Sequence, residues 1–147
     1  MGRRLGRNGS LFALLVLIAS LTGCGSGGLV VVEGTVKVDG APTGGVVLMF
    51  FPKSDPNGVT AAGTSDDQGK FTLTSGLDSG VAAGKYIVTA TYPDPAVKPT
   101  AAQMMQGTFE PGPDLLKGKY SKKQTSTIEI DITSGSKELA PIELKKG

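Results

Sequence analysis

Cys24 is the residue of this chain best suited to covalent chemistry, because it is the only cysteine and a thiolate is a strong nucleophile. The chain has no histidine, so the commonest general base and metal ligand is missing. No G-x-S-x-G elbow accompanies the serines, and four of them fall in polar loop sequence: Ser54, Ser65, Ser75 and Ser121. We therefore expect no catalytic residues and no enzyme activity.

The residues before Cys24 predict what its thiol does. Three arginines precede the apolar run LFALLVLIASL, and Gly23 is a small residue at the expected cleavage site, so residues 1–23 have the parts of a signal peptide. As a helix the run spans about 17 Å, whereas a membrane core measures roughly 30 Å. The order Leu21-Thr22-Gly23-Cys24 matches the bacterial lipobox, in which the cysteine is acylated and becomes the mature N-terminus. The alternative is an ordinary signal peptide with an incidental cysteine.

Cleavage between Gly23 and Cys24 changes the charge. It removes three of the 15 basic residues and none of the 13 acidic ones, which leaves 12 against 13 and a net charge of −1. Binding to nucleic acid, which requires a concentrated basic face, is therefore not expected. With no second cysteine, no disulfide is expected either.

The expected anchor is a lipid on Cys24, followed by a short linker to residue 28. The four residues Gly25 to Gly28 extend to roughly 14 Å, so the folded body should sit close to its membrane. Ser26 stands where other bacterial lipoproteins carry an aspartate that favours the inner membrane. We therefore expect an outer-membrane or cell-surface location, on the periplasmic or extracellular face.

Residues 29–147 suit one domain, and their apolar residues alternate with a period of two. LVVVEGTVKVDG predicts a half-buried strand that ends at an Asp-Gly turn, and GGVVLMFFP predicts a more central strand that is covered on both faces or lies at an interface. The runs GVTAAGT, KFTLT, GKYIVTATYP, TSTIEIDI and ELAPIELKK bring the total to about seven strands, typical of an antiparallel β-sandwich. In this register Val36, Val88 and Ile130 point into the core, while Glu33, Thr89 and Glu129 face solvent.

Residues 93–124 break this pattern, with five of the nine prolines and no clean strand. Such a long connection is either a crossover loop over a sheet edge or a recognition loop. TAAQMMQG predicts one or two helical turns, in which Met104 and Met105 would cover an open end of the sandwich. The segment also contains a local cluster of lysines around Tyr120, a possible interaction loop for anionic headgroups or a glycan: Lys117, Lys119, Lys122 and Lys123.

The adjacent carboxylates of Asp66 and Asp67 do not have the spacing of a calcium loop. One of them is expected to accept backbone N–H groups in the turn TSDDQG, where Gly69 supplies a positive φ. The carboxylates of Asp94, Glu110 and Asp114 are expected to be solvated. We therefore predict neither a metal site nor a cofactor.

Four sequence blocks together resemble a known family. VEGTVKVDGAPTGGVVLMFFP, TSDDQGKFTLT, GVAAGKYIVTATY and KYSKKQTSTIEIDI are similar to segments of small planctomycete lipoproteins with a carboxypeptidase regulatory-like or transthyretin-like domain. Ala83 and Ser65 depart from the family's usual proline and threonine. The resemblance implies a transthyretin-like or immunoglobulin-like Greek-key sandwich at the cell envelope, and little about chemistry.

Two functions are consistent with these features. The first is a monomeric, lipid-anchored, non-catalytic β-sandwich with a structural or protein-interaction role in the bacterial envelope. The second is a binding protein for an envelope glycan or small ligand. Sugar rings stack on exposed aromatic side chains, tryptophan above all, and the chain has no tryptophan and only three tyrosines. The sequence therefore favours the first.

Overall fold

Strand β1 (Glu33–Val38) illustrates how the alternating sequence forms a sheet. Gly34, Val36 and Val38 are buried and Glu33 is exposed, as the alternation predicts. Asp39 (φ 52°) and Gly40 (φ 84°) are both left-handed, the conformation that a two-residue hairpin turn requires. The turn leads into β2 (Ala41–Pro42), which pairs with β1 in antiparallel orientation. The predicted Asp-Gly turn is therefore confirmed.

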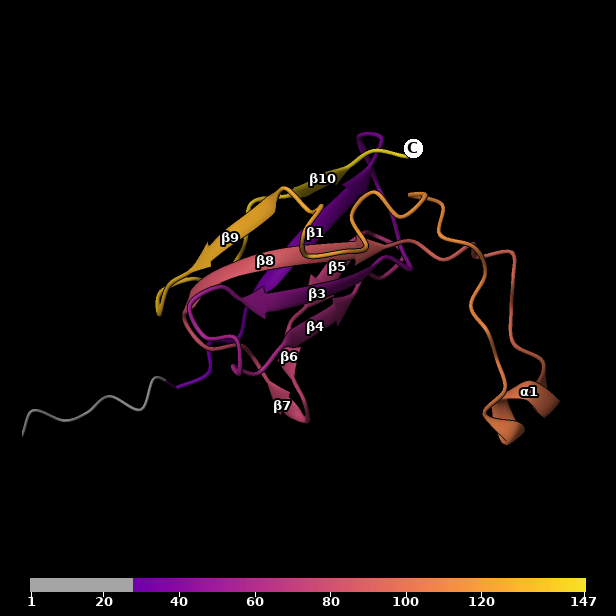
Figure 1. Ribbon diagram of the computed structural model, residues 1–147, viewed down its shortest axis with the longest axis horizontal. Coiled ribbons are helices and arrows are strands. Elements are labelled where there is room, and N and C mark those ends of the chain that lie inside the picture. The colour runs from indigo at the N-terminus through magenta and orange to yellow at the C-terminus, as the bar shows by residue number, and fades with distance from the viewer. Residues whose placement is uncertain (1–27) are drawn as a thin grey trace, which may run out of the picture.

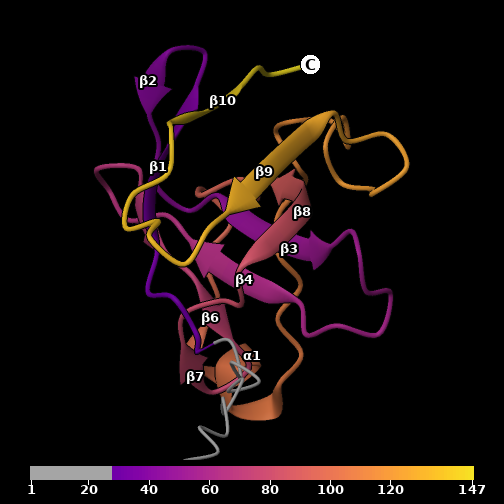
Figure 2. The same ribbon diagram turned by 90° about the vertical axis from the view of Figure 1, so that its left-hand side faces the viewer.

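The computed structural model describes residues 28–147, and in these the fold is all-β with two sheets (Figures 1 and 2). The larger sheet has the order β7-β6-β4-β3-β8-β9, and the smaller one joins β10, β1 and β2, with β5 also paired to β1. The remaining strands are β3 (Val47–Pro52), β4 (Ala61–Thr64), β5 (Lys70–Thr72), β6 (Thr74–Ser75), β7 (Asp78–Ser79), β8 (Gly84–Thr91), β9 (Ile128–Ile132) and β10 (Ile142–Leu144).

The strand count and pairing differ from the expectation of about seven antiparallel strands. The run KFTLT divides at the fully buried Leu73: β5 pairs with β1 in one sheet, and β6 pairs with β4 in the other. One predicted strand therefore serves both sheets. In addition, β10 lies parallel to β1, with Val36 opposite Ile142 and Val38 opposite Leu144, while the other strand pairs are antiparallel.

One hydrophobic core joins the two sheets. Phe50 of β3 lies with its ring centroid 6.3 Å from that of Phe71 on β5 and 6.2 Å from that of Tyr86 on β8. Val36 and Val88 are fully buried, and Ile130 is partly buried against the same core. These three inward positions agree with the predicted register.

Two predictions about exposure are wrong. Met49 on β3 is 40% exposed, so the central strand is not covered on both faces. Thr89, predicted to face solvent, is only 6% exposed. It lies opposite Met49 on β3, and the segment from Tyr120 to Ser126 covers the other edge of this half of β8, where the N–H of Ala90 donates to the Tyr120 carbonyl. Neighbours on both edges therefore bury a position that alternation alone leaves outside. Glu33 and Glu129 are exposed, as predicted.

The predicted signal peptide, the cleavage site at Gly23 and Cys24, and most of the linker lie outside the described residues. Within residues 28–147, none of the helices has the length and apolar character that crossing a membrane would require.

Candidate functional site

An arm, residues 93–113, extends from the body beyond the end of β8 and carries the only helix of the described residues at its tip (Figure 1). This helix, α1 (Ala101–Gln106), begins at Thr100, whose hydroxyl accepts the N–H of Gln103 while the Gln103 side chain accepts the N–H of Thr100. It ends at Gly107, whose φ of 64° is a left-handed cap. Local sequence therefore specifies the helix, which buries none of its residues.

Met104 and Met105 are 65% and 89% exposed, so the prediction that they cover an end of the sandwich is wrong. The helix lies at the tip of the arm, away from the core (Figure 1). The arm instead presents these two thioether side chains to solvent, and methionine adapts readily to a variety of apolar partners.

Asp114 holds the base of the arm together. Its Oδ1 accepts the N–H of Tyr92 at 2.8 Å and that of Leu116 at 3.0 Å, and its Oδ2 accepts the N–H of Gly118 at 2.9 Å. The N–H of Leu115 donates in turn to the Tyr92 carbonyl at 2.8 Å. The expectation that this carboxylate is merely solvated is therefore wrong. The signal in the sequence is the aspartate that begins the tight turn Asp114-Leu-Leu-Lys-Gly118.

Residues 114–124 form the other half of the long segment, and together with the residues up to 127 they belong to the body. Leu116 is fully buried and Tyr120 is 8% exposed. The Tyr120 hydroxyl accepts the N–H of Lys145, and the Ser126 hydroxyl donates to the carbonyl of Val88. Of the two interpretations of residues 93–124, the crossover loop over a sheet edge describes this half, while the arm has the exposed geometry of a recognition loop.

The four lysines of the predicted interaction loop are all exposed, but they meet different neighbours. The Lys119 ammonium lies 5.3 Å from the centroid of the Tyr120 ring, and that of Lys123 lies 4.7 Å from the centroid of Phe51 on β3. Lys117 sits in a left-handed turn conformation with φ 52°. Exposed contacts of a cation with an aromatic ring contribute about 0.5–1 kcal/mol each. Two of the lysines therefore already have an aromatic partner within the chain.

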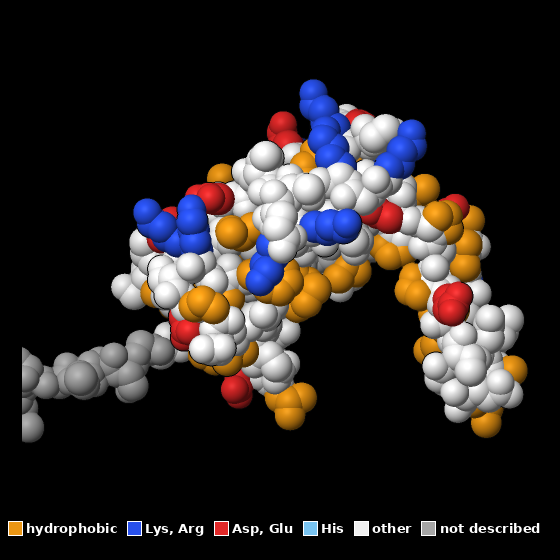
Figure 3. Space-filling view, viewed as in Figure 1, with side chains coloured by type: hydrophobic (Ala, Val, Ile, Leu, Met, Phe, Trp, Pro, Cys, Tyr) orange, Lys and Arg blue, Asp and Glu red, His pale blue; other side chains and the backbone are white. Residues whose placement is uncertain are grey.

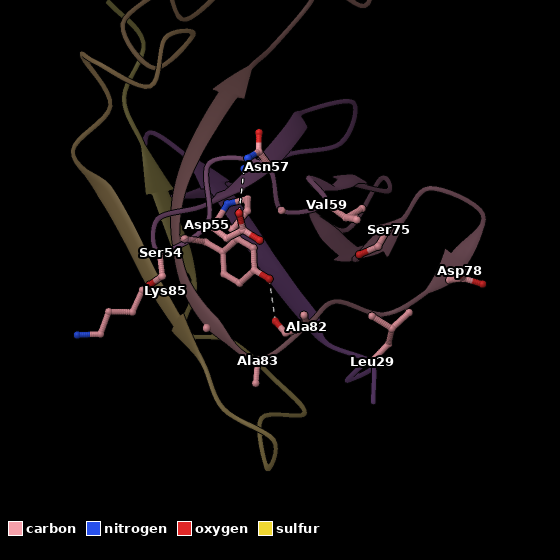
Figure 4. A pocket seen from close by; sticks show the side chains of 14 residues that line it. Leu29, Ser54, Asp55, Asn57, Val59, Ser75, Asp78, Ala82, Ala83 and Lys85 are labelled. Atoms are coloured by element: carbon pink, nitrogen blue, oxygen red, sulfur yellow. Dashed lines mark hydrogen bonds between the residues drawn. The ribbon is translucent and has the colours of Figure 1, made fainter. Parts of the chain in front are cut away.

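A pocket of about 530 Å³ opens at the end of the body where the described chain begins (Figure 4). Leu29, Pro52, Val59 and Ala82 contribute apolar surface to it, and Lys85 at its edge extends away from it. The Tyr86 hydroxyl donates to the Ala82 carbonyl at 2.8 Å. Burial raises the pKa of Tyr86 above its usual value near 10, so this phenol remains a protonated donor at neutral pH.

Two of the other polar groups of the pocket bond to their own chain. The Ser75 hydroxyl donates to the Gly80 carbonyl at 2.8 Å, and the Asp55 carboxylate accepts the N–H of Asn57 at 3.0 Å. The pocket therefore combines an apolar surface with several polar groups that already have partners. It suits a small apolar ligand better than a proton-transfer reaction.

Two of the serines expected in polar loops are buried. Ser65 is 5% exposed, and its hydroxyl donates to the Thr43 carbonyl at 2.7 Å and accepts the N–H of Val46 at 2.9 Å. Ser75 is 9% exposed. Ser54 is exposed and Ser121 donates to Gly118 within its turn. Ser134 and Lys137 have the S-x-x-K spacing of some hydrolases, and both lie exposed in the turn that follows β9.

The turn TSDDQG has the predicted geometry. Asp66 Oδ1 accepts the N–H groups of Gln68 and Lys70, both at 2.9 Å, and Gly69 has φ 74°. A Cβ at position 69 would lie 2.5 Å from the Val36 carbonyl oxygen, so the position requires glycine for space as well. Within the part of the chain that the structure describes, no three acidic, histidine or cysteine side chains gather as a metal ion would need.

Comparison of the chain with protein-family models, with characterised proteins and with solved structures finds no match.

Proposed function

We propose that this chain is a lipid-anchored, non-catalytic module of the bacterial cell envelope with a structural or protein-interaction role. The observation that carries the proposal is the order Leu21-Thr22-Gly23-Cys24 behind a charged and then an apolar segment. In this proposal Cys24 bears the lipid, cleavage falls before it, and the protein resides at the outer membrane or cell surface. The body is a sandwich of the transthyretin-like type suggested by the four sequence blocks.

The arm supports the interaction role. An apolar helix tip that buries none of its residues leaves Met104 and Met105 unpartnered within the described chain. Two or more acyl chains bind a protein stably to a bilayer, since each buried methylene contributes about 0.8 kcal/mol. An anchored body that extends such an arm is suited to contact a neighbouring envelope component, either a protein or the membrane surface itself.

A Cys24→Ser variant tests the anchor. Cells that express the wild type and are fed a fatty-acid analogue should incorporate the label into the protein, which should sediment with membranes. The Cys24→Ser protein should carry no label and should remain uncleaved or appear in the soluble fraction. Label retained on Cys24→Ser would contradict the proposal. A Ser26→Ala variant is the matched control, because it alters the linker without removing the thiol.

Binding of an envelope glycan or small ligand is the second candidate, and the pocket beside Tyr86 favours it. A ligand seated there would contact Val59 and Ala82. The three tyrosines argue against sugar stacking, since Tyr86 and Tyr120 are buried and Tyr92 is half-buried. Val59→Asp would abolish ligand binding at this pocket and leave binding through the arm intact, which separates the two candidates.

A further inference from the structure

The hairpin of β6 and β7 ends in the most exposed large apolar side chain among the described residues. Leu77 follows Gly76 (φ 64°) in the turn and has a relative exposure of 105%, so nothing in the body covers it. Turn positions normally carry polar residues or glycine. An exposed leucine in a turn forgoes the free energy that burial of its side chain would contribute.

This hairpin lies at the end of the body where the described chain begins. The N–H of Val30 donates to the Val81 carbonyl at 2.8 Å, and the N–H of Val81 donates back to Val30 at 2.9 Å. Leu29 and Asp78 line the same pocket. Leu29 is itself 44% exposed, and Val59 across the pocket is 66% exposed. An apolar end therefore surrounds the point from which the chain leads back toward Cys24.

The tip of the arm faces the same side of the molecule. Figures 1 and 2 both place α1 and β7 on the lower side, and Figure 1 shows them well apart along the long axis. In the space-filling view of Figure 3, both lower tips bear apolar side chains, with a hollow between them. The exposed apolar residues of these two tips are Leu77, Met104 and Met105.

Positive charge lies elsewhere. In Figure 3 the lysine side chains occupy the upper and middle parts of the face shown, and the segment that carries Lys117 to Lys123 crosses the upper half of the body in Figures 1 and 2. The helix α1 has no acidic residue in its first turn and no basic residue in its last. The charged groups nearest the tips in sequence are the acidic Asp78 and Glu110 and the basic Lys98, which leaves no excess of positive charge there. Apolar contact, and not attraction to anionic headgroups, therefore distinguishes this side.

From this arrangement we propose that Leu77, Met104 and Met105 insert into the interface of the bilayer that holds the lipid anchor, and so fix the orientation of the body on the membrane. The inference rests on the proposed lipidation of Cys24. The four residues up to Gly28 reach roughly 14 Å, which keeps this end within contact distance of the bilayer. Interfacial apolar side chains enter about 5–10 Å into the boundary between headgroups and acyl chains. The lysine face then points away from the membrane.

The absence of tryptophan makes the proposal measurable, because each introduced tryptophan is the only one in the protein. The variants are Leu77→Trp and Met105→Trp, with Ala41→Trp in the exposed β2 at the opposite end as the matched control. The lipidated mature protein is reconstituted into zwitterionic phosphatidylcholine vesicles that carry bromine on the acyl chains. Bromine quenches tryptophan only on close approach.

We expect the fluorescence of Leu77→Trp and Met105→Trp to shift to shorter wavelength and to be quenched several-fold more strongly than that of Ala41→Trp. Replacing part of the lipid with an anionic one should leave the quenching unchanged. Equal quenching of all three, stronger quenching of Ala41→Trp, or a blue shift without quenching, as a contact with a protein would produce, overturns the proposal. A protein that fails to co-sediment with vesicles defeats the lipid anchor itself, whereas a co-sedimenting protein with unquenched tips defeats only the orientation.

Discussion

The carboxylate of Asp114 accepts the backbone N–H of Tyr92 at 2.8 Å, and this bond joins the two ends of the arm across 22 residues of sequence. Pro93 and Asp114 form a bridge directly beside it, and the N–H of Asp94 donates to the Pro113 carbonyl at 3.0 Å. These hydrogen bonds hold the two segments of the arm together at its base, and so they fix the direction in which the arm leaves the body.

Asp114→Ala should loosen this stem. It removes three acceptor contacts and leaves partly buried N–H groups of Tyr92 and Leu116 without partners, for which a loss of about 1–3 kcal/mol in unfolding free energy is typical. Urea unfolding and hydrogen exchange at these amides measure the effect. Asp94→Ala is the control, because the Asp94 carboxylate accepts only the local N–H of Ala96 among the described contacts. Equal losses in the two variants would contradict the role given to Asp114.

Removal of the arm should abolish partner binding and spare the fold. The bridge between Pro93 and Asp114 brings the ends together, so a short glycine-serine link can replace residues 95–112, and loop-closure free energy varies only slowly with length. The deletion must stop before Leu116, which is fully buried. Pull-downs from envelope extracts with wild type, the deletion and a Met104→Ser, Met105→Ser double variant measure binding. Unchanged capture by the deletion would contradict an interaction role for the arm.

Val88→Ala should lower the free energy of unfolding by about 1–3 kcal/mol, since Val88 is fully buried and the variant loses methyl packing in the core. Thr89→Ala should cost less, because Thr89 is buried on the outer side of β8 by neighbouring segments. Glu129→Ala, at an exposed position on β9, should change stability by less than about 0.5 kcal/mol. Thermal melts decide the order, and a larger loss for Thr89→Ala than for Val88→Ala would contradict the register.

Stability should fall at alkaline pH partly through Tyr86. Burial raises the pKa of its phenol in the folded state above the unfolded value of about 10, so folding favours the protonated form. The contribution is fully present below about pH 10 and is lost as the pH rises through the folded pKa. Tyr86→Phe removes this titration, at the cost of the hydrogen bond to Ala82. Urea unfolding between about pH 8 and 11 should show a smaller decline for Tyr86→Phe, whereas parallel declines would exclude Tyr86 as a cause.

A metal chelator should leave the melting temperature unchanged. Asp66 and Asp114, two of the aspartates that a metal would compete for, already accept backbone N–H groups. Differential scanning calorimetry with and without EDTA tests this, with elemental analysis of the purified protein alongside. A melting temperature that falls by several degrees, or stoichiometric metal, would contradict the assignment of these carboxylates to turns.

The sequence by itself determined the features that depend on neighbouring residues. The inward face of β1, the Asp39-Gly40 turn, the Asp66 turn with its left-handed Gly69 and the capped helix α1 are each confirmed. Each depends on side-chain alternation, on a residue that tolerates positive φ, or on a side chain that bonds to backbone a few residues away. The order Leu21 to Cys24 belongs to this local kind of signal, and lipidation there remains a prediction.

Only the tertiary structure decided the features that depend on partners distant in sequence. Alternation does not specify which strand pairs with which, so neither the division of KFTLT between two sheets nor the parallel pairing of β10 with β1 is visible in it. Thr89 is buried because residues 120–126 pass beside β8. Asp114 joins the two ends of the arm because the fold brings it within hydrogen-bond distance of Tyr92, 22 residues earlier. In the sequence Leu77 and Met105 are isolated apolar residues, and only the fold turns both tips to one side of the molecule, because the direction of each tip depends on how the whole body packs.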